Sequence, residues 1–396
     1  MKKNIFILGL MALALSATSC SKDKESETDP VVDPVVTMPE GTDDPSVTIN
    51  ETDANYADYA ANWCSYAAAV SSRLKADAET LYKAWNEGLD GGEAFQTTFK
   101  EVKGAYSSPN ACIEQILDGC IDIANEVGES KIGDPRDKWE QGKYTEAVYA
   151  VESWYSFHSI EDYSNNIRSI QNAFNCKYKT AQGSHSIAAY LQANGQAEFA
   201  SQVNSAITAA INSIEGMAAP FRSHIGNNSV PVAMEACNNL KNILRTLKAK
   251  VEDFEDEEEL KAIVADYVDI VVLPTYSDLA AANANLHEAV LALAAAPSDA
   301  TFEAAAQAWM SARQPWEMSE AFLFGPVDEL GLDPNMDSWP LDQDAIKNVL
   351  ASGDYQGLDW SGEFDEDNED IAEAQSIRGF HTLEFLLFKD GKPRTI

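Results

Sequence analysis

Three short stretches of the sequence carry polar residues that could bind a ligand or take part in catalysis. In the first, GFHTLEFLLF at 379–388, His381 and Glu384 stand three residues apart inside a very apolar segment. On a helix this spacing puts both side chains on one face. A buried ionisable pair needs partners, because an unpaired charge in a core is costly. The pair indicates either part of a metal or catalytic site or a hydrogen-bonded core pair joined by Arg378.

The second stretch, RQPWEMSEAFLFGP at 313–326, places Arg313, Glu317 and Glu320 at positions i, i+4 and i+7 of an expected helix. Carboxylates surrounded by tryptophan and phenylalanine need a partner, which could be Arg313, a metal ion or a proton. Taken alone, this stretch is explained more simply by an Arg–Glu pair on one helix.

The third stretch is ESWYSFH at 152–158, where Glu152 and Ser156 share a helix face at i and i+4. Tyr155 is adjacent and His158 follows. A serine on a helix lacks the strained turn that exposes a catalytic oxygen, so this pattern does not indicate a serine nucleophile. A structural role is the simpler interpretation here as well.

The elements that must position these residues are predicted to be helices. From residue 51 onward apolar residues recur at helical spacing, with almost no alternation of β-branched residues. The three stretches fall in expected helices at 367–388, 300–322 and 142–175, with strong breaks between helices such as 325–340. The pattern predicts an all-α fold of packed antiparallel bundles.

Composition limits the classes of partner. The chain has 396 residues, with 28 Lys and Arg against 64 Asp and Glu, a formal net charge of −36. A surface this negative repels phosphate backbones, so nucleic-acid binding is excluded. An acidic run at 252–259 divides the chain, and we expect helical halves at 50–250 and 262–396, joined by an acidic linker at 251–261.

The N-terminus has the features of an export signal. Residues 1–20 contain two lysines, an apolar run too short to span a bilayer, and small residues before Cys20. Cys20 is therefore expected to carry a lipid, and the polar segment 21–48 to be a flexible tether. This predicts an outer-membrane lipoprotein, periplasmic or surface-exposed. The other five cysteines are expected to be buried free thiols.

The polar strings together resemble the imelysin family of bacterial extracytoplasmic proteins, which includes an insulin-cleaving peptidase and iron-regulated proteins. The hallmark GxHxxE is present as Gly379, His381 and Glu384, and RQPWEMSEAFLFGP and DPNMDSWPLD precede it in order. The segment 265–279 resembles the usual opening of the family, and 152–167 resembles its later half.

The order of these segments is inverted relative to ordinary members, in which the GxHxxE half comes first. We infer a circular permutation from this order. Such a permutation requires Ile396 and the region around Thr52 to lie near each other.

The resemblance implies two packed helical bundles with a polar cleft between them. One histidine with several carboxylates is a hard, oxygen-rich donor set that suits iron or another transition-metal ion better than a thiolate-type zinc site. The residues expected to line this cleft are His381, Glu384, Glu317, Glu320, Glu152 and Ser156, with Arg313 as the charge-balancing group.

Three functions follow from the resemblance. The first is a lipid-anchored protein that binds iron or an iron complex in support of uptake, with an outer-membrane iron transporter as its partner. The second is a zinc-dependent metallopeptidase in which Glu384 or another glutamate activates water. The third is a helical scaffold that contacts an outer-membrane transporter without any metal.

Overall fold

The helical periodicity of the sequence produces helices throughout the part of the chain that the structure, a computed structural model, describes: residues 54–153, 155–360 and 364–396. The all-α expectation is confirmed. In these residues the strands form two short antiparallel hairpins, β1–β2 (Lys177–Tyr178 with Ala181–Gln182) and β3–β4 (Phe388–Lys389 with Lys392–Pro393).

The first part of the chain forms α1 to α9. Their bounds are α1 Trp63–Asn86, α2 Phe95–Lys100, α3 Pro109–Asn125, α4 Gly133–Glu140, α5 Tyr144–Tyr149, α6 Ser159–Asn175, α7 Ile187–Ala193, α8 Ala197–Glu215 and α9 Ser229–Lys248. The second part forms α10 Glu257–Asp266, α11 Leu273–Ala295, α12 Asp299–Glu317, α13 Pro326–Glu329, α14 Leu332–Asp337, α15 Gln343–Ser352, α16 Glu369–Gln375 and α17 Gly379–Leu387.

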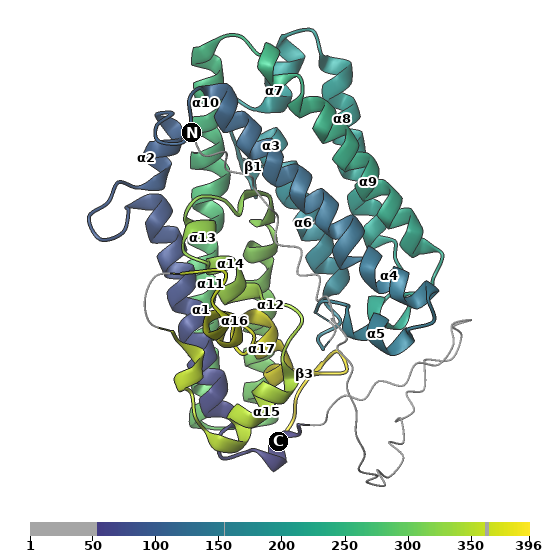
Figure 1. The fold of residues 1–396 in the computed structure, drawn as a ribbon, viewed down its shortest axis with the longest axis vertical. Coiled ribbons are helices and arrows are strands. Elements are labelled where there is room, and N and C mark those ends of the chain that lie inside the picture. The colour runs from purple at the N-terminus through teal and green to yellow at the C-terminus, as the bar shows by residue number, and fades with distance from the viewer. Residues whose placement is uncertain (1–53, 154, 361–363) are drawn as a thin grey trace, which may run out of the picture.

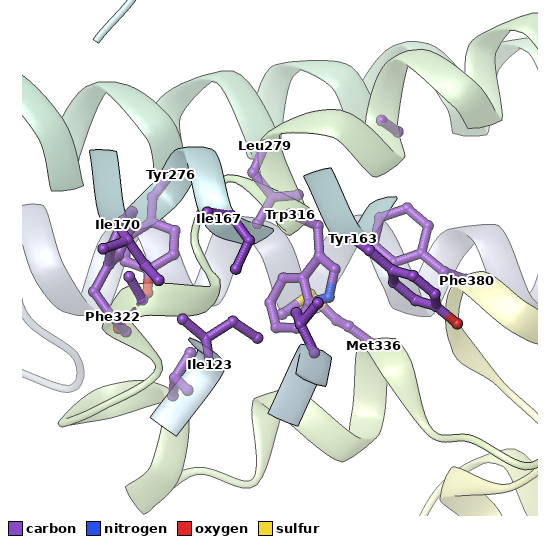
Figure 2. Packing of buried hydrophobic residues seen from close by; sticks show 14 of the residues in the cluster. Ile123, Tyr163, Ile167, Ile170, Tyr276, Leu279, Trp316, Phe322, Met336 and Phe380 are labelled. Atoms are coloured by element: carbon purple, nitrogen blue, oxygen red, sulfur yellow. Dashed lines mark hydrogen bonds between the residues drawn. The ribbon is translucent and has the colours of Figure 1, made fainter. Parts of the chain in front are cut away.

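The long helices pack as two bundles (Figure 1). One bundle joins α3, α6, α8 and α9, and the other joins α1, α11, α12 and α17. The bundles meet where α12 packs against α6 and where the 3-10 turn Glu320–Phe322 packs against α3 and α6. One apolar cluster fills the space between the helices, and Figure 2 shows Tyr163, Leu279 and Trp316 within it.

The acidic run at 252–259 is only partly a connection between helices, because α10 begins inside it at Glu257. Asp256 caps this helix by accepting a hydrogen bond from the amide of Glu259 at 3.3 Å. The acidic side chains of the first turn interact favourably with the free amides and the positive end of the helix dipole. Part of the run therefore has a local structural role.

Two of the three expected helices are each divided into two, and the third ends earlier than predicted. The expected helix 142–175 is interrupted between Tyr149 and Ser159, where Ser153 and Phe157 have φ of 53° and 63°. The expected helix 300–322 ends at Glu317, after which the amide of Ser319 bonds to the carbonyl of Trp316 at 2.7 Å. Such a short-range bond starts a tighter turn.

The expected helix 367–388 is divided into α16 and α17 because Gly379 has φ of +85°, which right-handed helices do not allow. Arg378 before it is extended. A new helix therefore starts at the motif glycine, and its direction is set by this break.

The five cysteines of the described residues are free and buried, as predicted. Within the same residues, no helix combines the length and apolarity needed to cross a membrane. The expected signal peptide, the lipidation site Cys20 and the tether 21–48 lie outside the described residues.

The C-terminal end of the chain packs beside its first described residues (Figure 1). Arg394 donates a hydrogen bond to the carbonyl of Ala54 at 3.0 Å, and Lys389 donates one to the Asn55 side chain at 3.4 Å. This proximity is what a circular permutation requires. The permuted order itself stays a prediction.

We expect Gly379→Ala to destabilise the fold by about 2–4 kcal/mol, because the left-handed backbone is strained and a β-carbon would lie 2.5 Å from the Met336 carbonyl oxygen. Urea unfolding measures this loss. The matched control is Gly142→Ala, where φ is +76° but nothing lies within 4 Å of the added carbon, and we expect a loss of about 1 kcal/mol. Equal losses would show that the contact with Met336 is unimportant.

Candidate functional site

Arg313 lies at the centre of a buried cluster of charged side chains between the two bundles. It stands in the last turns of α12, and its side chain has no exposed surface. Its guanidinium contacts Glu317 and Glu152 at 2.6 Å and Asp162 at 3.3 Å, and it also binds Asp337. Four carboxylates from three helices and one turn thus meet on one cation.

His381, near the start of α17, lies beside this cation and is also fully buried. Its Nε2 atom is 3.1 Å from Asp337 and 3.3 Å from Glu152. Burial alone would lower the pKa of His381, but these two carboxylates outweigh burial and the nearby Arg313 and raise it well above its usual value. The ring of Trp339 lies edge-on to the imidazole, with 4.8 Å between centroids.

Glu384 lies one helical turn further on α17 and contacts the other nitrogen of the same imidazole. Its Oε2 atom is 3.1 Å from His381 Nδ1. Its Oε1 atom accepts hydrogen bonds from the amide and the hydroxyl of Ser156, at 2.8 and 2.7 Å. Glu384 is thus on the side of the ring away from Glu152 and Asp337.

Lys131 supplies a second buried cation. It ends a π-helical segment, Glu126–Lys131, that continues α3. Its ammonium lies 3.1 Å from Glu152 and 3.6 Å from Glu320. Burial raises the pKa of Glu320 well above its usual value, and Lys131 offsets only part of that effect.

Carboxylates outnumber cations in this cluster, so their pKa values diverge. Burial raises the pKa of Glu317 to about 8 and that of Asp333 to about 7. Burial also acts on Glu152, but Lys131, the hydrogen bond from His381 and Arg313 outweigh it and lower the pKa of Glu152 to about 2. Ionised and protonated carboxyl groups therefore coexist within a few ångströms.

Two groups of side chains in the cluster bring three donor atoms within 4.8 Å of one another. One consists of Glu152, Asp337 and His381, and the other of Glu317, Glu320 and Asp337. The first combines a ring nitrogen with two carboxylates, which is a set of ligands found around zinc and iron. The second contains oxygen donors only.

The structure brings every described candidate of the sequence into this one cluster. Gly379 positions α17, and Ser156 binds Glu384. The members predicted from sequence are His381, Glu384, Glu317, Glu320, Glu152, Ser156 and Arg313. Because most of these side chains are buried, they form a closed core between the bundles and not the open cleft that we expected.

The local structure around two of these predictions differs from the expectation. Glu152 and Ser156 do not share a helix face, because residues 150–153 and 155–158 lie outside helices, between α5 and α6. Glu320 does not continue the helix of Arg313 and Glu317, because α12 ends before it. The side chains meet through tertiary packing and not through helical spacing.

Sequence reasoning missed Asp337, Lys131 and Asp162. Asp337 lies in the DPNMDSWPLD string, so the string that supported the family resemblance already contained the signal. Its Oδ2 atom also accepts a hydrogen bond from the indole of Trp316 at 2.7 Å. The spacing of Lys131 relative to the other charged residues carries no signal in the sequence.

Comparison with known proteins identifies relatives along the whole folded part. The family model described as Imelysin matches residues 41–247 and 272–396. The crystal structure of an imelysin peptidase from Bacteroides ovatus is 45% identical, with a TM-score of 0.84, and the alignment covers 87% of this chain and 99% of that one.

A curated relative is iron-regulated protein A of Synechococcus elongatus, which is 38% identical over 130 residues. The match covers 33% of this chain and 32% of that protein, so the chain spans about a third of the length of this relative.

We expect Arg313→Met to destabilise the protein by about 3–5 kcal/mol or to prevent folding, because it leaves four buried carboxylates without their common counter-charge. Urea unfolding followed by circular dichroism measures the loss. The control Arg168→Met removes an ion pair with Glu215 at the surface and should cost less than about 1 kcal/mol. A similar loss in both variants would contradict a central role for Arg313.

We expect His158 to stabilise the fold at neutral pH and to lose this effect in alkali. Burial would lower its pKa, but Asp162 and Glu161 outweigh burial and raise it to about 9 from a reference of 6.5. The stabilisation is complete below pH 6.5 and disappears as the pH rises through 9, and it amounts to roughly 3 kcal/mol.

Urea unfolding from pH 6 to 10 gives the free energy of unfolding of the wild type and of His158→Gln. We expect the difference between these two free energies to shrink as the pH rises. His287→Gln is the control, because burial lowers the pKa of His287, the opposite direction from His158. A difference that stays constant with pH would contradict the prediction.

Proposed function

The chain belongs to the imelysin family, and on that premise we propose that it binds a metal ion, with iron favoured, in the buried cluster and thereby supports iron uptake at the cell envelope. The observation that carries this proposal is the donor set of Glu152, Asp337 and His381, whose ligand atoms lie within 4.8 Å of one another.

The chemistry of this donor set fits a transition-metal ion. One imidazole nitrogen and two carboxylates would supply three ligands, and they favour a harder ion than a thiolate site does. Glu317 and Glu320 in the surrounding core have raised pKa values, and a bound cation would favour their ionised forms. Because Glu152 and Asp337 also bind Arg313, a bound ion would share both carboxylates with the guanidinium.

The preference for iron is supported by the relative. Iron-regulated protein A carries iron regulation in its name, and it matches this chain at 38% identity over 130 residues. The relative is about three times as long as the segment that matches this chain. We therefore propose the link to iron for this chain on the basis of a partial match.

We further propose that the protein is an outer-membrane lipoprotein anchored through Cys20, periplasmic or surface-exposed. The support is the signal-like sequence of residues 1–20 and the polar tether at 21–48. An outer-membrane iron transporter is the partner that this location and an iron-binding role favour.

A zinc-dependent peptidase is the second candidate, because Asp337 supplies the third ligand that a catalytic zinc site needs. Two observations favour binding over peptide cleavage. Glu384, the sequence candidate for general base, uses both carboxylate oxygens on His381 and Ser156. In addition, His381 has no exposed surface that a peptide bond could reach.

We expect the purified full chain to bind one Fe²⁺ per chain in an anaerobic titration, and Asp337→Asn and His381→Gln to abolish this binding. The control His185→Gln alters a more exposed histidine paired with Glu259 at 3.0 Å and should leave binding unchanged. Circular dichroism confirms that each variant is folded.

Other results would change the assignment. Tight Zn²⁺ binding together with cleavage of peptides by the loaded wild type would establish the peptidase. If neither ion binds the wild type, both metal proposals fail and a metal-free scaffold explains the family fold.

A further inference from the structure

The two ring nitrogens of His381 face different groups, and this difference defines a further role in the site. Nε2 is directed at Asp337 and Glu152, the two carboxylates of the proposed donor set. Nδ1 is directed at Glu384, at 3.1 Å. A carboxylate can only accept a hydrogen bond, so the contact with Glu384 places a hydrogen on Nδ1, and Nε2 is the nitrogen that would bind an ion at the donor set after giving up its own hydrogen.

Glu384 is itself held in place from the opposite bundle. Its second oxygen accepts two hydrogen bonds from one residue, the amide of Ser156 at 2.8 Å and its hydroxyl at 2.7 Å. Glu384 has no exposed surface, so its rotamer is fixed by these contacts. Neither of its oxygens is directed toward Glu152 or Asp337.

We infer that Ser156 is a positioning residue that acts through Glu384 to fix the tautomer and ring orientation of His381. This inference rests on the proposed metal-binding function. It assigns Glu384 of the GxHxxE motif to orienting the histidine, not to binding the ion or activating water. A carboxylate behind a ligating histidine commonly has this role and raises the basicity of the ligand nitrogen.

The turn residues at 150–153 and 155–158 make this arrangement possible. Positive φ values at Ser153 and Phe157 take the chain out of a helix, so the amide of Ser156 is free to bind a side chain. The turn is held by the hairpin that follows α17, because the amide of Gly391 donates to the carbonyl of Tyr155 at 2.9 Å. The same C-terminal segment therefore supplies His381 and restrains the residue that orients it.

The test compares metal binding in Ser156→Ala and Ser156→Thr with the wild type, using Fe²⁺ for affinity and Co²⁺ for the visible spectrum. We expect Ser156→Ala to weaken Fe²⁺ binding by about 10–100-fold and to change the Co²⁺ spectrum. Ser156→Thr keeps the hydroxyl and should restore both. The control Ser164→Ala removes a hydroxyl that donates to the carbonyl of Glu161 outside the cluster and should have no effect.

The outcomes separate this inference from the proposed function. Wild-type affinity and spectrum in Ser156→Ala, with binding abolished in His381→Gln, would overturn the positioning role and leave the metal site intact. A loss that Ser156→Thr does not restore, with an equal loss of thermal stability, would make Ser156 a structural residue and also overturn it. Failure of the wild type to bind either ion would overturn the proposed function and this inference together.

Discussion

The fold depends on neutralising an arginine that has no access to water. Arg313 brings together carboxylates from α6, α12, α14 and the turn before α6, so the two bundles can close only when all four reach the same guanidinium. Such an ion cluster contributes less to stability than a well-packed apolar core would, because each charge must lose its water. Its value is specificity, since a wrong register of the bundles would leave buried charges without partners. We therefore regard the cluster as the contact that fixes how the bundles meet.

The chain departs from regular helix at several residues that contribute side chains to the charged cluster around Arg313. The π-helical segment Glu126–Lys131 ends with the lysine that reaches Glu152 and Glu320, and a π-helical turn changes the direction of the residues after it. The turn residues at 150–153 and 155–158 present Glu152 and Ser156 to different members of the cluster. Gly379 allows α17 to start beside the carbonyl of Met336, one residue before Asp337. Each irregular segment costs local stability, and each places a charged or hydrogen-bonding group that a continuous helix would direct elsewhere.

The all-α class and most of the cluster members could be predicted from sequence, because helical periodicity and short polar motifs are local signals. His381, Glu384, Arg313 and Glu317 were found in this way, each on a helix as expected. The sequence could not show that Glu152 and Glu320 lie outside α-helices. Tertiary hydrogen bonds, such as the one that the amide of Ala321 donates to the Ser169 hydroxyl, override the local preference for helix. Lys131 had no local signal at all. A lone lysine between acidic residues suggests a surface, and only the fold shows that it is 8% exposed.

The closed geometry of the cluster favours an ion over a larger ligand. A small cation needs only donor atoms and a brief opening, whereas a peptide needs a groove that remains open during turnover. Trp339 is a partly exposed neighbour of His381, and its indole donates a long 3.4 Å hydrogen bond to the carbonyl of Ala150. A displacement of this indole would break one long hydrogen bond, so a brief opening for an ion costs less than the permanent groove that a peptide needs.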